Sequence, residues 1–338
     1  MEKDGKIPVY SSISDNNGIT GYTQISPTYM ISDETPFYVV FGDHTRSFNI
    51  ANTDFCVMDN VKVLKPLRSY TLKELIFVIS SWGNGVLDKG YSRHWSIAKK
   101  VRIPLPTKDG KIDFDFMDAY ISELEEERIS ELTAYLTVSG LDNYKLSSEE
   151  KEALEKINLE VDNWKLFQIR DVFNVKSSKK KFDANKVEIL NYGFPYIVRM
   201  STNNGLKGYL NQDEQLLNQG NTIAFGQDTA TMFYQENPYF TGDKIKVLEC
   251  RYNEFNKINS MFLISVMRKS FSTFSWGANS FSEEVINNQE IKLPTKNNEI
   301  DFSYMELLIS AVKKLVIKDV VLYADSKINA TKKVISKK

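Results

Sequence analysis

The chain has 338 residues, and its 42% hydrophobic and 26% charged residues are typical of globular proteins. The length predicts two domains rather than one. The formal net charge of −1 excludes a strongly basic nucleic-acid-binding protein, so any surface for DNA must be a local patch of cations.

The two cysteines, Cys56 and Cys250, lie in different halves and form no CxxC pair, which argues against a thiolate metal site. Isolated cysteines fit a reducing compartment. The first residues lack the apolar core of a signal peptide, and no apolar run approaches the roughly 20 residues of a membrane span. We therefore expect a cytoplasmic protein without a membrane partner.

In chain order, the first half alternates short strands with turns. Strands are predicted at Pro8–Tyr10, Phe37–Phe41 and Val61–Leu64. Asn16–Gly18 predicts a tight turn, since Asn and Gly accept a positive φ. Helical spacing follows at Thr71–Ile79, so this half reads as an α+β domain.

A long amphipathic helix is predicted next, with Asp113 as its N-cap. Its apolar stripe follows a three–four spacing through Met117, Ile121, Leu124, Arg128, Leu132 and Tyr135. After it, Ser147–Glu155 predicts a capped, acidic helical connector, which is unsuited to facing phosphate.

The second half repeats this order. It has a strand at Ile245–Leu248, helical spacing from Ile258 to Met267, and a final helix capped by Asp301. The stripe of that helix runs through Met305, Ile309, Val312, Val316 and Val320. The two stripes are about equal in length, and each helix is expected near 23 residues. Long helices with narrow apolar seams tend to pair, so an antiparallel coiled coil of the two is predicted.

Three blocks of sequence recur in the same order, which identifies an internal duplication. Ser14–Tyr22 matches Ser201–Tyr209 at six of nine positions. Residues 41–64 align without a gap to residues 225–248, and Ile103–Met117 matches Ile291–Met305. The copies span roughly residues 1–137 and 162–325. The second opens with Asp162–Ile169, some thirty residues ahead of its matching blocks, whereas the first begins almost at its first block.

This plan resembles the specificity subunits of Type I restriction–modification systems and of some Type IIB enzymes. The resemblance rests on Ile-x-Leu-Pro…Ile-Asp-Phe-x-x-Met, present twice, on the opening Trp164-Lys165-x-Phe167-x-Ile169-x-Asp171-Val172-Phe173, and on the connector from Tyr135 to Glu150. It implies an α+β fold of two target-recognition domains, each followed by a long helix. The domain bounds expected are 1–106 for an N-terminally short first recognition domain, 107–161 for helix and connector, 162–296 for the second recognition domain, and 297–338 for the second helix and tail.

The same resemblance implies a non-catalytic subunit that reads a bipartite site in double-stranded DNA. It implies that the paired helices dock adenine methyltransferase subunits, and nuclease subunits where these exist. S-adenosylmethionine is then expected on the methyltransferase, and no cofactor in this chain. Half-sites one turn of DNA apart need readers about 34 Å apart, and about 23 helical residues span that length.

Candidate DNA contacts are cations for phosphate and amides or hydroxyls for base edges. In the second copy they are Lys176, Lys179, Lys180, Lys181, Arg199, Asn203, Asn204 and Lys207; in the first they are Ser11, Ser12, Asn16, Asn17, Thr20, His44, Arg46 and Arg93. Matched positions that differ, such as His44 against Asp228 and Arg46 against Ala230, are the better specificity candidates.

Some of these candidate residues also have a simpler structural interpretation. A lysine run is commonly a solvated loop, and Asn16-Asn17-Gly18 is first of all a turn. His44 and His94, the only histidines, have no metal partner near them in sequence.

No nucleotide-binding, hydrolase or metalloprotease motif occurs, and Asn237-Pro238-Tyr239 lacks the second proline of the adenine-methyltransferase motif. Two alternatives stay open. One is a non-catalytic protein- or glycan-binding protein with two β-rich heads on a helical stalk. The other is a nuclease whose acidic residues meet only on folding, for which Mg²⁺ dependence would be diagnostic.

Overall fold

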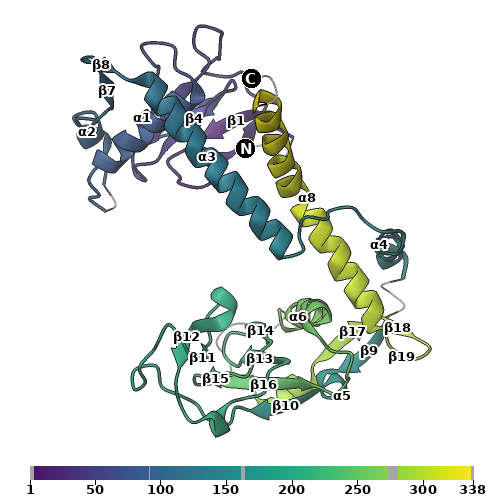
Figure 1. Cartoon of the computed structure of the whole chain (residues 1–338). Helices are drawn as coiled ribbons and strands as arrows, with labels where there is room; N and C mark the ends of the chain where they lie inside the picture. The colour runs from purple at the N-terminus through teal and green to yellow at the C-terminus, as the bar shows by residue number, and fades with distance from the viewer. Residues whose placement is uncertain (1–3, 91, 161–163, 273–280, 336–338) are drawn as a thin grey trace. The chain divides into compact units, whose positions relative to one another are not determined.

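The structure, a computed structural model, describes residues 4–90, 92–160, 164–272 and 281–335. The chain divides into two compact units, Met1–Ala134 and Tyr135–Lys338. Each combines small β-sheets with helices and continues into a long helix (Figure 1). The α+β class predicted from the sequence is confirmed.

The first unit contains two three-stranded sheets, with strand orders β2-β1-β5 and β4-β3-β6. Its elements are β1 (Ile7–Tyr10), η1 (Asn16–Gly18), β2 (Ile19–Thr23), β3 (Tyr38–Gly42), β4 (Phe48–Ala51), β5 (Cys56–Val57), β6 (Val61–Leu64), α1 (Leu72–Gly85), α2 (Trp95–Ala98), β7 (Thr107–Lys108), β8 (Lys111–Ile112) and α3 (Phe114–Val138).

The core of the first unit is built from several small clusters. Tyr10, Val40 and Phe55 are buried together between the two sheets. Helix α1 begins with a capping box, in which the Thr71 hydroxyl accepts from the Glu74 N–H and the Glu74 carboxylate accepts from the Thr71 N–H. This fixes the helix end beside the sheet β4-β3-β6.

The second unit has the same two sheets and more strands. Its sheets have the orders β10-β16-β13-β14, β12-β11-β15 and β17-β9. Its elements are α4 (Ser148–Glu160), β9 (Lys165–Gln168), α5 (Ile169–Val172), β10 (Phe173–Ser177), β11 (Phe194–Ile197), η3 (Asn203–Gly205), β12 (Leu206–Leu210), η4 (Glu214–Leu216), β13 (Thr222–Gly226), β14 (Met232–Gln235), β15 (Phe240–Thr241), β16 (Ile245–Cys250), α6 (Lys257–Phe271), α7 (Glu283–Asn288), β17 (Glu290–Leu293), β18 (Thr295–Lys296), β19 (Glu299–Ile300) and α8 (Phe302–Ile335).

One large apolar cluster holds the second unit together. Phe173 of β10, Phe225 of β13, Met267 of α6 and Met305 of α8 are fully buried in it. The first turn of the long helix α8 therefore belongs to the globular part, and the unit positions this helix.

The connector helix α4 packs on α8 through one buried carboxylate. Glu150 is 4% exposed and accepts from the Ser310 hydroxyl at 2.6 Å and from the Lys314 ammonium at 2.8 Å. Burial opposes ionisation, but these hydrogen bonds hold the pKa of Glu150 below its usual value. The predicted N-terminal cap is present, since the Ser147 hydroxyl accepts from the Glu150 N–H.

The predicted caps of both long helices are confirmed, but their equal length is not. Asp113 accepts from the Phe116 N–H and Asp301 from the Tyr304 N–H, each at 2.9 Å. Helix α3 has 25 residues, near the predicted 23, whereas α8 has 34. Helix α8 continues beyond Val320, where the predicted apolar stripe ends, because no glycine or proline interrupts the sequence before Ile335.

The two units repeat one frame of sheets in the same register. In β3–β6, Val39 pairs with Leu64, and in β13–β16 the matching Ile223 pairs with Leu248. The duplication predicted from the sequence is thus confirmed in three dimensions. The pairing of α3 with α8 stays a prediction.

Candidate nucleic-acid interface

The β1–β2 and β11–β12 hairpins end in the same Asn-Asn-Gly turn. Asn17 and Asn204 have φ values of 50° and 51°, in the left-handed region that Asn tolerates. Gly18 and Gly205 follow with φ values of 77° and 73°. The turn predicted from the sequence is therefore present in both units.

The side-chain amides of these asparagines hold their own turns. Asn16 donates to the Ile19 carbonyl and Asn203 to the Leu206 carbonyl, each at 3.0 Å. Asn17 and Asn204 donate across to the next hairpin, to the Ile50 and Tyr234 carbonyls. The four residues are exposed, but their Nδ2 groups are engaged, and the Asn17 amide oxygen also accepts from the Ile50 N–H at 3.4 Å. Their predicted contacts with bases therefore have to come from the other amide oxygens or from an exchange of partners.

In the first unit, a neutral contact joins the β1–β2 connection to the β3–β4 turn. The Ser12 hydroxyl accepts from the His44 N–H at 2.9 Å and the Thr45 N–H at 3.4 Å. Arg46, at a φ of 60°, donates to the Val86 carbonyl at 3.0 Å and pairs with Asp88 at 2.9 Å. The structure thus brings Ser12, His44 and Arg46 to one end of the unit.

At the same place in the second unit, an ion-pair network replaces this neutral contact. Arg199 matches Ser12, and its guanidinium pairs with Asp228, which matches His44. The Asp228 carboxylate also pairs with the Lys244 ammonium at 2.9 Å. The same arrangement of strands and turns therefore carries uncharged hydrogen-bonding groups in the first unit and an ion pair in the second.

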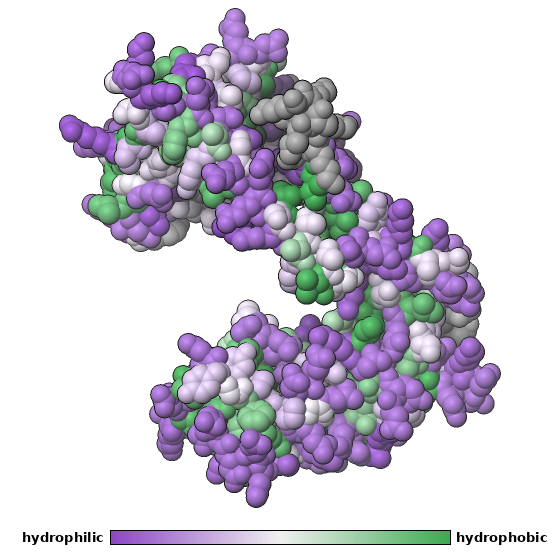
Figure 2. All heavy atoms as spheres, in the orientation of Figure 1, coloured by the Kyte–Doolittle hydropathy of each residue, from purple (hydrophilic) through white to green (hydrophobic). Residues whose placement is uncertain are grey.

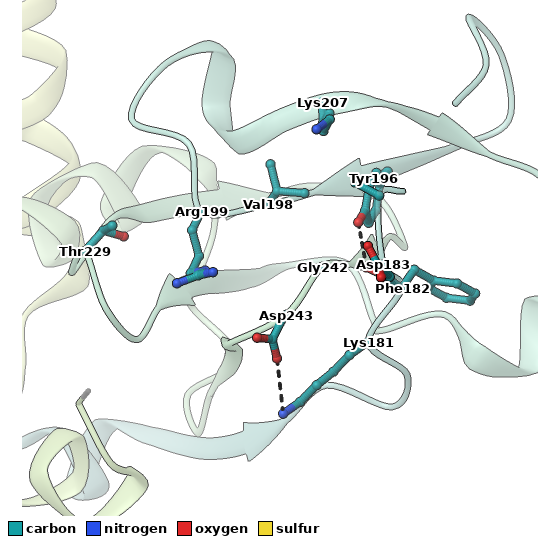
Figure 3. A pocket seen from close by; sticks show the side chains of 11 residues that line it. Lys181, Phe182, Asp183, Tyr196, Val198, Arg199, Lys207, Thr229, Gly242 and Asp243 are labelled. Atoms are coloured by element: carbon teal, nitrogen blue, oxygen red, sulfur yellow. Dashed lines mark hydrogen bonds and ion pairs between the residues drawn. The ribbon is translucent and has the colours of Figure 1, made fainter. Parts of the chain in front are cut away.

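A hollow lies beside this network, between β11, β12 and the β15–β16 turn (Figure 3). Its charged lining consists of the cations Lys181, Arg199 and Lys207 and the carboxylates Asp183 and Asp243. Figure 3 shows Lys181 facing Asp243, with 3.8 Å between the ammonium and the carboxylate. Exposed cations around an open hollow suit phosphate or a base edge.

The floor of the hollow is rigid. The Tyr196 hydroxyl donates to the Phe182 carbonyl at 2.7 Å, and Tyr196 is 1% exposed. Burial raises the pKa of Tyr196, so its hydroxyl stays a donor. The Lys181–Ala184 segment is therefore fixed against β11.

The predicted lysine run is not one uniform loop. Lys176 lies in β10 and pairs with Glu249 of β16. The Lys179 ammonium donates to the Gln215 carbonyl at 3.3 Å. Among the described residues, the ammonium groups of Lys180 and Lys207 have no hydrogen bond or ion pair, and both are exposed. These two lysines can bind phosphate without breaking a contact.

The remaining candidates of the first unit are more scattered. Thr20 of β2 matches Lys207 of β12, and it is partly buried. The Ser11 N–H donates to the Gly18 carbonyl within the hairpin turn. Arg93 is exposed and lies directly before His94.

Sequence reasoning missed Lys244, Asp228 as its partner, and Asp243. Lys244 occupies a turn position with a φ of 55°, and its match in the first unit is Asn60, with a φ of 62°. A charged residue at a position where the other copy has the usual turn residue was a usable signal, because both positions lie inside the gap-free block of the repeat.

His94 is a structural residue. It is fully buried, its Nδ1 lies 3.1 Å from the Asp43 carbonyl, and its Nε2 accepts from the Lys89 N–H at 3.2 Å. Among the described residues, no group of three or more His, Cys, Asp or Glu could hold a metal ion, and no helix could cross a membrane.

Residues 161–321 match the protein family described as "Type I restriction modification DNA specificity domain". This stretch of the second unit is assigned to that family. The family resemblance seen in the sequence is thereby confirmed, and the hollow, with its Arg199 network, belongs to this specificity domain.

The chain is similar to a curated relative in sequence and to a solved structure in fold. A 148-residue segment, 43% of this chain, is 28% identical to the Type II restriction enzyme specificity subunit S.BcgI of Heyndrickxia coagulans and covers 42% of that protein. The crystal structure of a Type I restriction–modification S subunit from M. genitalium superposes with a TM-score of 0.57 at 14% identity, over 99% of this chain and 89% of that one. The second likeness extends the fold of the specificity subunits to both units, with two β-rich parts each followed by a long helix.

Proposed function

We propose that this chain is the specificity subunit of a restriction–modification complex, in which each unit reads one half of a split DNA site. The proposed recognition domains are residues 1–106 and 162–296, with 107–161 and 297–338 as the helical parts. The observation that carries the proposal is the specificity domain of the second unit, repeated in the first on the same sheets.

The side chains at the two equivalent ends support two different half-sites. The second unit offers the guanidinium of Arg199, oriented by Asp228, and the free ammonium of Lys207. The first unit offers the hydroxyl of Ser12 and the ring of His44 at the matching place. Arginine reads guanine edges and phosphates, whereas hydroxyls and imidazoles form other contacts. To recognise an asymmetric bipartite site, two domains of the same fold need different side chains at equivalent positions, as these two units have.

The long helices offer surfaces for partner subunits. The middle of helix α8 exposes hydrophobic side chains (Figure 2), namely Val312, Leu315, Val316, Val320, Leu322 and Tyr323. Helix α3 exposes Tyr120, Tyr135 and Val138. We assign these faces to helix pairing and to adenine methyltransferase subunits, which supply S-adenosylmethionine and the chemistry. Nuclease subunits would join through the same assembly.

The test is adenine methylation of a random-sequence DNA library after co-expression of the chain with the neighbouring methyltransferase gene. One split motif with a fixed spacer is the expected result. The Arg199→Ala variant should change the preference in one half of that motif only, and Lys292→Ala, an exposed lysine outside the hollow, should change neither half. A folded complex that methylates no motif, or methylates without sequence preference, would refute the proposal.

A further inference from the structure

The turn that follows the short parallel strand is built in the same way in both units. Strand β5 pairs with β1 in the same register in which β15 pairs with β11. Directly after β5, the Met58 N–H donates to the Tyr10 carbonyl at 2.8 Å. Directly after β15, the Gly242 N–H donates to the matching Ile197 carbonyl at 2.8 Å. Met58 and Gly242 therefore occupy equivalent positions of the duplicated fold.

Gly242 belongs to the lining of the hollow in the second unit, next to Val198 and Tyr196 (Figure 3). There is little room for a side chain at this glycine, because a Cβ would lie 3.0 Å from Val198 Cγ1 and 3.3 Å from the Tyr196 hydroxyl. The first unit has the smaller residues Ser11 and Val9 at the two matching positions. A longer side chain can therefore be accommodated where the second unit has glycine, and the first unit has a methionine there.

Three cations at this end of the second unit have uncharged counterparts in the first. The matching residues are Ser12 for Arg199, Thr20 for Lys207 and Asn60 for Lys244. The nearby Arg46 of the first unit already donates to the Val86 carbonyl and pairs with Asp88. Arginine and lysine read the acceptor edge of guanine, so the first unit is less suited to guanine at these positions than the second.

The side chain of Met58 adds an apolar group to this uncharged surface, and Met58 is 50% exposed. A single exposed apolar residue is common on proteins, but this one matches a position that lines the hollow of the second unit. Methionine is flexible and polarisable, so its side chain adapts to a small apolar group. Among the groups that base pairs present in the major groove, the C5 methyl of thymine is the apolar one.

We infer that Met58 is a specificity-determining residue, which contacts the C5 methyl group of a thymine in the half-site of the first unit. This inference rests on the proposed function and names the base that the first unit favours. The hydroxyls of Ser12 and Thr20 are compatible with this contact, because a hydroxyl can donate to or accept from the polar groups of a thymine–adenine pair. The second unit has no side chain at the matching Gly242 and offers Arg199 instead, which suits guanine.

The probe is a duplex with the split motif that methylation of the random library yields, in which one thymidine at a time is replaced by deoxyuridine. Uracil lacks the C5 methyl of thymine and keeps its hydrogen-bonding groups, so only the methyl contact is removed. In the half-site that Arg199→Ala leaves unchanged, one replacement should weaken binding of the complex with the methyltransferase. The expected loss is about fourfold, which is the effect of burying one methyl group.

Variants of the full chain separate this contact from a structural role of Met58. Met58→Ala should bind the thymidine and deoxyuridine duplexes equally, because the apolar partner of the methyl group is gone. Met58→Leu keeps an apolar side chain of similar volume and should keep a difference between the two duplexes. The matched control is Leu67→Ala, which removes another exposed apolar side chain of the first unit and should keep the full difference. A general loss of stability would weaken binding of both duplexes alike, so the ratio of the two affinities is the readout.

The inference is wrong if the half-site of the first unit contains no thymine, or if the wild type binds every deoxyuridine duplex as tightly as its parent. It is also wrong if Met58→Ala keeps the difference between the two duplexes, because another residue then contacts the methyl group. Each of these results is obtained on a recognised motif and leaves the proposed function intact. A complex that recognises no motif would refute the proposed function and this inference with it.

Discussion

Ser12 and Arg199 stand at one position of a duplicated fold, each joined to the neighbouring turn, but through different chemistry. Ser12 accepts main-chain hydrogen bonds, whereas Arg199 forms an ion pair with Asp228. A guanidinium held by a carboxylate is pre-oriented and can form two parallel hydrogen bonds with guanine. We therefore expect Arg199 to contribute more to sequence specificity than the matching Ser12.

We predict that Asp228→Asn and Arg199→Ala affect DNA binding in different ways. Arg199→Ala should weaken binding of the cognate site by about 10-fold or more, since a bidentate base contact contributes about 1–3 kcal/mol. Asp228→Asn removes a negative charge next to Arg199 and Lys244, so non-cognate binding should strengthen while the preference for the cognate site falls. Equilibrium titrations with cognate and scrambled duplexes measure both effects. Parallel losses on both duplexes would argue against a base contact by Arg199.

Lys180, Lys181 and Lys207 should act on phosphate and not on sequence. Replacing Lys179, Lys180 and Lys181 together by Ala should weaken binding to all duplexes alike, and Lys207→Ala should add to the loss. Each lost phosphate contact should reduce the slope of log K against log salt by about 1. Titrations from about 50 to about 200 mM salt check this. An unchanged slope in the triple variant would place this segment away from the DNA backbone.

At the scale of elements, the contact between α4 and α8 depends on the ionisation of Glu150. Its pKa is lower in the folded state than the ordinary value of 4.5, so it stabilises the fold above that pH and loses the effect as the pH falls through the folded pKa. Glu150→Gln should cost about 1–3 kcal/mol at pH 7, because Lys314 and Ser310 lose a charged acceptor.

Urea unfolding followed by tryptophan fluorescence measures this, since Trp164 contacts Tyr304, whose hydroxyl donates to the Ala153 carbonyl of α4. The difference between wild type and Glu150→Gln should shrink as the pH falls below about 4.5. Glu152→Gln, which affects only an exposed ion pair with Lys156, is the matched control. A difference independent of pH would mean that the charge of Glu150 does not stabilise the contact.

Local sequence patterns predicted the helices and strands well, but not which side chains of distant segments lie together. The strands β3, β6 and β16 and the caps Asp113 and Asp301 follow from short-range signals that act within a few residues. The hollow does not, because Lys181 and Asp243 are brought together by the parallel bridge between Lys181 and Thr241, which are far apart in the sequence. Nor can the side chain of Lys176 be assigned from sequence, since its partner Glu249 lies on another strand.

At the scale of the whole molecule, the proposed function assigns base recognition and the distance between half-sites to different parts of the chain. The recognition ends are built by the small sheets, while the helices α3 and α8 carry no candidate base contact. In helix α3, Glu126 and Glu127 are exposed on the surface. The distance between half-sites is therefore expected to follow helix length and not the bases between them.

We predict that lengthening α3 changes the spacer of the recognised motif and leaves both half-sites as they are. Seven residues with strong helix propensity, inserted after Glu127, lengthen the helix by about 10 Å and rotate it by about two full turns. Since DNA rises about 3.4 Å per base pair, the spacer should grow by about 2–3 base pairs. Methylation of the random library by the complex with the lengthened chain gives the new motif directly.

The control for this insertion is the double substitution Glu126→Ala and Glu127→Ala, which alters the same exposed surface without changing the length of α3. It should keep the original spacer, because neither side chain is placed near a base. If the lengthened chain methylated the original motif with its original spacer, α3 could not be the element that sets the separation. If the spacer changed and a half-site changed with it, reading and spacing would be coupled, because a rigid helix that only separates two readers leaves each reader's contacts intact.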